Sequence, residues 1–335
     1  MKIAVDAMGG DHAPEEILLG VARAFEKGFT RPEEVILVGM PDRFEPFFAK
    51  APVLRQCELR VATEEVAMGE SPVKVLRKPQ SSIMLAMEAV KSGAAGAFVS
   101  AGSTGACVAA AWRVLGPLKN VDRPGIAVTF EGAGGPLTIL DVGANIHATP
   151  EHLFQYGVMG ELFSRSVLGV AKPRVALLNI GEEEEKGNKL VKGTRDLFEG
   201  APFHFVGNVE GNHLLSGKAD VVVCEGFVGN VVLKVFEGVG HYFHDAVKGP
   251  LADPVAQVSP LGKAVRGITQ KLDYAEYGGA PLLGVNGLVM IMHGRSDRRA
   301  MANALRVSAQ FVAADVNRQI GRALADGAPG AESAT

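Results

Sequence analysis

The sequence of 335 residues is poor in several features that mark common protein classes. Its three cysteines, Cys57, Cys107 and Cys224, lie far apart and form no CxxC pair, so they predict neither a disulfide framework nor a metal site. No run of about 18 apolar residues occurs, so we expect no membrane-spanning helix. The opening residues MKIAVDAMGGDH resemble a strand and a glycine turn rather than a signal-peptide core. These absences favour a protein of the reducing cytoplasm.

A strong charge of one sign is also absent, because the formal net charge is -3 at pH 7. Nucleic-acid binding needs clustered Lys and Arg, so we expect no nucleic-acid partner. The fingerprints GxxxxGK(S/T), GxGxxG with a following acidic residue, GxSxG and HExxH do not occur. This disfavours an ATP-driven kinase, a NAD dehydrogenase, a serine hydrolase and a zincin. We expect neither a cofactor nor a resident metal.

Short apolar runs alternate with amphipathic stretches, which is typical of an α/β fold. Runs that are apolar throughout are expected in a mostly parallel sheet with helices on both faces. We find no repeat and no Pro- or Ser-rich linker, so residues 1–325 are expected to form one domain, followed by a flexible tail at 326–335. The predicted strands are 3–7, 34–39, 97–101, 137–143, 174–181 and 220–226. The predicted helices are 14–28, 81–93, 103–115, 149–168, 229–248 and 297–325, the last with Asp297 as its N-cap.

The stretch at residues 251–272 carries one apolar stripe, interrupted by Asp253-Pro254 and Ser259-Pro260, which predict two short helices. Lys263, Arg266 and Lys271 make this stretch basic and amphipathic, which suits an anionic membrane surface. A core helix or a dimer-contact helix is the alternative interpretation. The stripe consists of Leu251, Val255, Val258, Leu261, Val265, Ile268 and Leu272.

Five glycine-rich turns follow apolar strands and mostly open onto helices. Glycine lets a ligand approach the backbone, and free N–H groups at helix starts attract anions. Because ligands of open α/β sheets bind outside the carboxyl ends of the strands, we expect the turns to gather there around a phosphate. Each turn alone is also explained by turn geometry. The turns are MGGDH (8–12), AGSTGA (101–106), DVGAN (141–145), GEEEEKGN (181–188) and EGFVGN (225–230).

Polar residues in these turns are the candidate ligands of that phosphate. Lys186 follows four glutamates, so it either binds an anion or offsets their charge. Asn230 either caps the helix that follows or hydrogen-bonds a substrate oxygen. His12 is either a turn histidine or an acid or base, and Cys224 is a small core residue.

A last polar turn, HGRSD at residues 293–297, precedes the C-terminal helix. Arg295, Arg298 and Arg299 form the densest basic cluster of the chain. This cluster is either a solvated helix start or a docking patch for an acidic protein or anionic substrate.

Several motifs from residue 1 to about 325 occur together in one known family: IAVDAMGGDHAP, SAGSTGA, DRPGIA, LLNIGEEEEKGNKL, DVVVCEGFVGNVVLK and YAEYGGAPLLGV before HGRSD. In these motifs the chain resembles the PlsX phosphate acyltransferases. The resemblance implies a three-layer α/β/α sandwich, like isopropylmalate dehydrogenase and phosphotransacetylase. It also implies a homodimer with active sites near the subunit interface and a protruding helical arm, at about 240–275, that associates with the inner face of the cell membrane.

Carried over by motif, Lys186 and Asn230 correspond to the principal active-site residues of the family. Ser103 stands where the family motif usually has Asn, so a hydroxyl takes the place of an amide. The predicted phosphate- and substrate-binding residues are Gly9, Gly10, Asp11, His12, Ser103, Thr104, Asp141, Asn145, Asn188, His293 and Ser296.

The resemblance implies transfer of a fatty acyl group from acyl carrier protein to inorganic phosphate, giving acyl phosphate for phosphatidic acid and phospholipid synthesis. It also implies a downstream glycerol-3-phosphate acyltransferase as a possible partner. A phosphate oxygen can attack the thioester directly, since a thiol of pKa about 8.5 leaves readily, so no enzyme nucleophile is expected. The alternatives are a phosphotransacetylase-like enzyme acting on acyl-coenzyme A, a decarboxylating dehydrogenase, and a membrane-associated scaffold for lipid enzymes.

Overall fold

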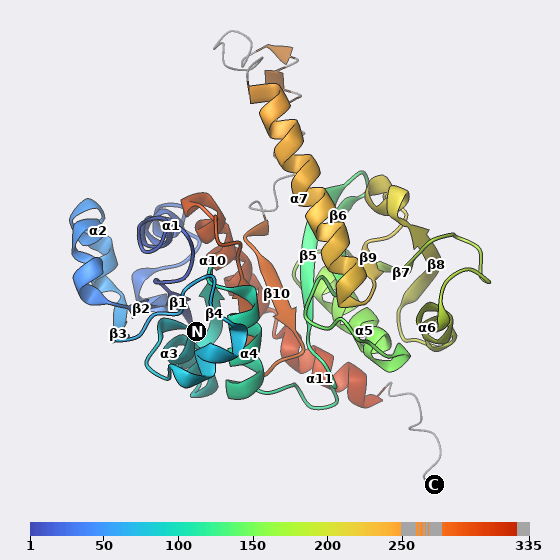
Figure 1. The fold of residues 1–335 in the computed structure, drawn as a ribbon, viewed down its shortest axis with the longest axis horizontal. Helices are drawn as coiled ribbons and strands as arrows, with labels where there is room; N and C mark the ends of the chain where they lie inside the picture. Colours follow the sequence, from blue (N-terminus) through green and yellow to red (C-terminus); the bar gives the residue numbers. More distant parts are fainter. Residues whose placement is uncertain (249–258, 261, 264, 266, 268–276, 327–335) are drawn as a thin grey trace.

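The computed structural model describes residues 1–248, 259–260, 262–263, 265, 267 and 277–326 (Figure 1). These residues build one sheet in the order β3-β2-β1-β4-β11-β10-β5-β6-β9-β7-β8. Its strands are β1 (Lys2–Asp6), β2 (Val35–Gly39), β3 (Glu58–Val61), β4 (Ala95–Ser100), β5 (Gly125–Gly132), β6 (Gly135–Leu140), β7 (Arg174–Asn179), β8 (His204–Glu210), β9 (Val221–Val223), β10 (Ala280–Leu283) and β11 (Leu288–Ile291). The helices of the described residues include α1 (Glu15–Glu26), α2 (Glu45–Lys50), α3 (Ser82–Lys91), α4 (Thr104–Val114), α5 (Pro150–Ser166), α6 (Lys189–Glu199), α7 (Gly226–Lys248), α10 (Arg298–Ala313) and α11 (Val316–Asp326).

The sheet consists of two parallel blocks that run in opposite directions. Strands β1, β2, β3, β4 and β11 pair in parallel, and so do β6, β7, β8 and β9. Between the blocks, β10 is antiparallel to both β11 and β5, and β5 is antiparallel to β6. Because of these three successive reversals, the carboxyl ends of the strands lie along one border of the sheet in one block and along the opposite border in the other. We call each of these borders, formed by strand ends, an edge of the sheet.

Both faces of the sheet are covered, which confirms the three-layer prediction. Alternate side chains of the strands enter different cores, because successive residues of a strand point to opposite faces. Val5 belongs to the core beneath α1, α5 and α10, whereas Ala4 belongs to the core beneath α3, α4 and α7. The continuous apolar runs of the sequence follow from this double burial.

The six predicted strands and the first five predicted helices all occur, with shifted ends. The single helix predicted at 297–325 is wrong, because the chain breaks into α10 and α11 at Asp315, whose φ is 51°. A left-handed residue cannot continue a right-handed helix. Asp297 does cap α10, since its carboxylate accepts from the N–H groups of Arg299 and Ala300 at 2.9 Å.

Helix α7 projects beyond the layers between the two halves of the sheet (Figure 1). Of the stripe predicted at 251–272, Val265 belongs to the described residues, whereas Leu251, Val255, Val258, Leu261, Ile268 and Leu272 lie outside them. Residues 327–335 of the predicted tail also lie outside them. Among the described residues, no helix has both the length and the apolar character required to span a bilayer.

Candidate active site

The turns after β1, β4 and β11 meet at one edge of the sheet. The backbone N–H of Asp11 donates to the carbonyl of Gly294 at 2.7 Å, which joins the MGGDH turn to the HGRSD turn. Below them, the Ser100 hydroxyl donates to the Asp6 carboxylate at 2.6 Å and accepts from the N–H of Gly102. These bonds hold residues 9–12, 102–104 and 293–296 beside one another.

Gly9 is required at this edge because the backbone passes directly over a buried carboxylate. A Cβ atom on Gly9 would collide with Asp6 Oδ2 and would lie 2.7 Å from the N–H nitrogen of Gly102. The Asp6 carboxyl is fully buried, and this burial raises its pKa, although its hydrogen bonds lower it. The MGGDH motif therefore has a steric reason for its first glycine that is independent of any ligand.

The DVGAN turn lies at the opposite edge and is shaped by one carboxylate. Asp141 Oδ1 accepts from the N–H groups of Ile126, Gly143 and Ala144 at 2.9 to 3.1 Å. Its Oδ2 accepts from the backbone and side-chain N–H groups of Asn145. Burial raises the pKa of Asp141, and the same hydrogen bonds oppose that rise. Asp141 thus positions the turn and presents Asn145.

The alternative role of Asn230 as a helix cap is wrong. Helix α7 begins at Gly226, and the Glu225 carboxylate accepts from the N–H groups of Phe227 and Val228 at its start. Asn230 therefore lies within the first turns of the helix. Its side chain faces the DVGAN turn, since a Cβ atom on Gly143 would lie 3.6 Å from Asn230 Cγ.

A cavity of about 610 Å³ lies between α4 and α7, over the centre of the sheet. Most of its wall is apolar, with polar groups confined to a few positions, which is the usual composition of a small-molecule site. Because α4 starts at one edge of the sheet and α7 at the other, this cavity connects the two sets of turns. Its wall includes Thr104, Gly105, Val108, Ala109, Trp112, Arg123, Pro124, Ile126, Val128, Val142, Gly143, Asn145, Asn230, Leu233, Lys234, Glu237, Ile291, Met292 and His293.

The expectation that all five glycine turns gather at one edge is wrong. Turns 8–12 and 101–106 lie at the carboxyl ends of the block that contains β1 and β4. Turns 141–145, 181–188 and 225–230 lie at the carboxyl ends of the block that contains β6, β7 and β9. Opposite strand directions cause this division. Of the predicted site residues, the cavity brings together Thr104, Asn145, Asn230 and His293.

The turn that carries Lys186 lies at the same edge as the DVGAN and EGFVGN turns, but none of its described residues belongs to the cavity wall. Lys186 is exposed in the loop after β7 and is not among the described residues of the cavity wall. Asn188, in the same loop, is the N-cap of α6, because its side-chain oxygen accepts from the N–H of Val191 at 3.0 Å. The described cavity wall likewise does not include Gly9, Gly10, Asp11, His12, Ser103, Asp141 or Ser296.

His293 is the titratable side chain that links the HGRSD turn to the cavity. Its Nδ1 accepts from the backbone N–H of Arg295 at 3.1 Å, so the neutral ring carries its proton on Nε2. Burial lowers the pKa of His293, which favours this neutral form.

Two cations and one tryptophan of the cavity were not predicted as site residues. Arg123 and Lys234 line the wall, and Arg123 stacks on Trp112 with its guanidinium carbon 5.6 Å from the ring centroid. The DRPGIA motif contains Arg123, so a signal was present in the sequence. Because this arginine does not follow a glycine-rich turn, turn spacing alone does not mark it as a ligand.

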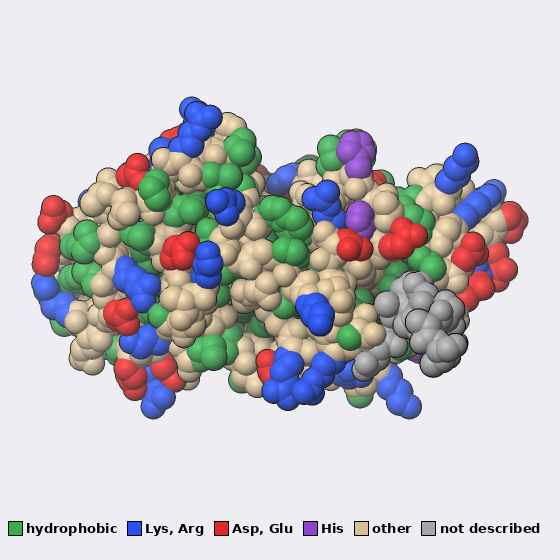
Figure 2. All heavy atoms as spheres, turned by 90° about the horizontal axis from the view of Figure 1, so that it is seen from below, with side chains coloured by type: hydrophobic (Ala, Val, Ile, Leu, Met, Phe, Trp, Pro, Cys, Tyr) green, Lys and Arg blue, Asp and Glu red, His purple; other side chains and the backbone are tan. Residues whose placement is uncertain are grey.

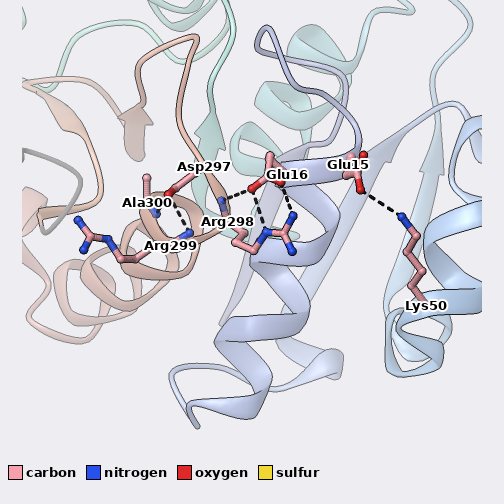
Figure 3. A network of polar contacts seen from close by, with 7 residues as sticks. All are labelled: Glu15, Glu16, Lys50, Asp297, Arg298, Arg299 and Ala300. Atoms are coloured by element: carbon pink, nitrogen blue, oxygen red, sulfur yellow. Dashed lines mark hydrogen bonds and ion pairs between the residues drawn. The ribbon is translucent and has the colours of Figure 1, made fainter. Parts of the chain in front are cut away.

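The basic cluster at 295–299 is partly engaged within the fold. The Arg298 guanidinium binds the Glu16 carboxylate and thereby ties α10 to α1, while Glu15 pairs with Lys50 of α2 (Figure 3). The hydrogen bond from Arg298 is the main cause of the lowered pKa of Glu16. On the face drawn in Figure 2, acidic and basic side chains are interspersed, without one continuous basic surface.

The three cysteines are buried, and burial raises the pKa of Cys57 and of Cys107 to about 12. Burial also raises the pKa of Cys224, whose thiol donates to the carbonyl of Asp141 at 3.5 Å. Their thiols therefore stay protonated at neutral pH. Within the described ranges, no group of three or more His, Cys, Asp or Glu side chains is arranged to hold a metal ion.

A family model described as "Fatty acid synthesis protein" matches residues 1–319. The phosphate acyltransferase of Heliobacterium modesticaldum is 49% identical over 318 residues, covering 93% of this chain and 94% of that protein. The phosphate acyltransferase of Synechococcus elongatus is 45% identical over 317 residues, with 92% and 90% covered.

Solved structures of similar fold include a phosphotransacetylase from Streptococcus pyogenes, with a TM-score of 0.63 and 14% identity over 93% of this chain and 94% of that one. A branched-chain phosphotransacylase from Enterococcus faecalis has a TM-score of 0.60 and 16% identity over 93% and 99%. At such low identity these likenesses concern the fold alone.

We predict that Asp141→Asn destabilises the protein. The change replaces one accepting oxygen by an NH₂ group that faces backbone N–H donors, and a buried donor without an acceptor costs about 1 to 3 kcal/mol. Urea unfolding at pH 7 measures this loss. Asp42→Asn, at an exposed position, is the control and should keep the wild-type midpoint. Equal midpoints for both variants would contradict the assigned role of Asp141.

Proposed function

Since the chain belongs to the PlsX family of phosphate acyltransferases, we propose that it transfers a fatty acyl group from acyl carrier protein to inorganic phosphate. The product is an acyl phosphate, which supplies phosphatidic acid and phospholipid synthesis. The acyl carrier protein as donor, the site residues, the assembly and the location are parts of this proposal.

The cavity between α4 and α7 is the observation that supports the proposal best. A long apolar wall suits a fatty acyl chain, since burial of each CH₂ group is worth about 0.8 kcal/mol. Asn230 supplies an amide group at one end of this wall, beside the DVGAN turn. An apolar substrate that carries one reactive polar group matches this distribution.

The reaction needs positioning more than covalent help from the protein. A phosphate oxygen attacks the thioester carbonyl carbon, the new C–O bond forms, and the C–S bond breaks as the thiolate leaves with its electron pair. The thiolate then takes a proton. Donors fixed before reaction stabilise the tetrahedral oxyanion at no reorganisation cost.

We assign two principal roles within this mechanism. Asn230 orients the phosphate or the thioester oxygen, because its amide lies on the cavity wall beside the DVGAN turn. Lys186 binds or neutralises phosphate, an assignment that rests on the family motif and not on a position in the cavity. The other predicted binding residues on the cavity wall are Thr104, Asn145 and His293.

The test is an assay of the purified protein with acyl carrier protein thioester and varied inorganic phosphate. We expect acyl phosphate and free carrier protein to appear only when phosphate is present. A parallel reaction with acyl-coenzyme A tests the donor, and we expect it to be slower. Faster turnover with coenzyme A would overturn the carrier-protein donor, and the absence of any acyl phosphate would instead favour a scaffold.

In the same assay, Asn230→Ala and Lys186→Ala are each expected to lower turnover about a hundredfold, the typical cost of removing one preorganised donor. Lys192→Ala, an exposed lysine of α6, is the control and should be fully active. A wild-type rate in either variant would refute the role assigned to the residue that it lacks.

We propose that the protein is a homodimer and that α7 contributes to the contact. One face of this projecting helix is apolar and exposed in the described chain, with Val231, Val235 and Val239 each about half exposed. An apolar helix stripe of this kind is typically covered by a partner. The remaining exposed apolar side chains of α7 are Phe227, Val228 and Tyr242.

We predict that Val235→Asp shifts the protein from dimer to monomer in light scattering, because a carboxylate in an apolar contact loses hydration without gaining a partner. Val206→Asp, at an exposed valine of β8, should leave the dimer intact. A dimeric Val235→Asp variant would place the contact elsewhere.

We further propose that the arm at about 240–275 holds the protein at the anionic inner face of the cell membrane, close to a glycerol-3-phosphate acyltransferase that consumes the acyl phosphate. Support comes from the apolar and basic stripe in the sequence, and from the last turns of α7, which begin this arm and project beyond the layers (Figure 1). Val265→Asp should move protein from anionic vesicles to the supernatant in a sedimentation assay, with the assay in solution unaffected. Val206→Asp is the control. If Val265→Asp sediments with the vesicles to the same extent as this control, the stripe does not bind the membrane.

A further inference from the structure

We propose that Arg123 binds the attacking inorganic phosphate, with its guanidinium held in place by the ring of Trp112. This inference rests on the proposed phosphate acyltransferase reaction and adds a substrate-binding residue to it. It concerns a residue of the DRPGIA segment that precedes β5, a part of the chain remote from the loop of Lys186.

A cation–π contact holds the guanidinium of Arg123 beside Trp112. Its guanidinium carbon lies 5.6 Å from the Trp112 ring centroid, which is within cation–π range. This contact acts through the positive charge of the guanidinium and uses none of its N–H groups as hydrogen-bond donors. Those groups form a rigid fork that matches two oxygens of a phosphate.

Hydrogen bonds place Arg123 at the end of the cavity that holds the asparagines. Asn145 Nδ2 donates to the carbonyl of Pro124 at 2.5 Å, directly after Arg123. Two residues further on, the N–H of Ile126 donates to Asp141 Oδ1 at 3.0 Å. The DRPGIA segment is therefore attached to the DVGAN turn, whose Gly143 adjoins Asn230.

The distribution of charge singles out Arg123 among the cations of the cavity wall. Lys234 Nζ lies 2.8 Å from Glu237 Oε2, so its charge is offset by a neighbour. Within the described residues, no ion pair of 4 Å or less includes Arg123. The adjacent Asp122 carboxylate instead accepts from Gln155 Nε2 at 2.9 Å. An uncompensated guanidinium on the same cavity wall as the Asn230 amide is a suitable site for a phosphate dianion.

Steady-state kinetics of Arg123→Gln, with phosphate varied at saturating acyl carrier protein thioester, tests the assignment. We expect the KM for phosphate to rise about tenfold or more, because a charge-assisted pair of hydrogen bonds is lost. The KM for the thioester should stay within about twofold of wild type. Arg123→Lys should recover part of the loss, since it keeps the charge without the fork.

Arg113→Gln is the matched control, because Arg113 is exposed on the same helix as Trp112 and is not among the described residues of the cavity wall. Trp112→Leu should raise the phosphate KM by a smaller factor. In the Arg123→Gln background it should have no further effect, as expected when one residue acts through the other. Additive effects of the two changes would overturn the role of Trp112.

If Arg123→Gln turns over too slowly for kinetics, thermal unfolding with added inorganic phosphate gives a second measurement. Wild type and Arg113→Gln should be stabilised by phosphate, whereas Arg123→Gln should not. An unchanged phosphate KM, a rise confined to the thioester KM, or equal stabilisation of all three proteins would overturn the assignment. A wild-type protein that forms no acyl phosphate would instead refute the proposed function.

Discussion

The reversal of strand direction at the centre of the sheet is the constraint on which the site depends. The antiparallel pairings around β10 and β5 turn one parallel block over relative to the other. As a result α4 and α7 start from opposite edges and enclose a cavity between them on the same face. If all strands ran in one direction, the glycine turns would all lie at one edge, and the cavity would not connect two sets of turns.

Two buried carboxylates organise the two edges in the same way. Asp6 anchors the first turn of the chain, and Asp141 anchors the DVGAN turn through backbone N–H groups. Burial of an ionisable group is costly unless hydrogen bonds offset the loss of water. Each aspartate therefore serves the shape of a turn, and the groups presented to the cavity are its neighbours.

In the proposed reaction, the cavity positions both substrates and the protein forms no covalent intermediate. The thiols are buried and protonated, and the cavity offers amides, cations and a neutral histidine beside an apolar wall. Such a site can hold an anion against a thioester and stabilise the charge that develops on the carbonyl oxygen. Fixed geometry then supplies what a nucleophilic side chain supplies in other acyltransferases.

Local signals in the sequence determined six of the eleven strands in the described residues, five of the helices, the cap at Asp297 and, through shared motifs, the family. They depend on residues a few positions apart, and so can be recognised without the fold. Strand direction instead depends on pairing between distant segments, so only the tertiary structure showed that the glycine turns divide between two edges. It also showed that Asn230 lies inside a helix, and that the described cavity wall includes Arg123 but not Lys186. These placements arise where segments remote in sequence pack against one another, which residue spacing does not encode.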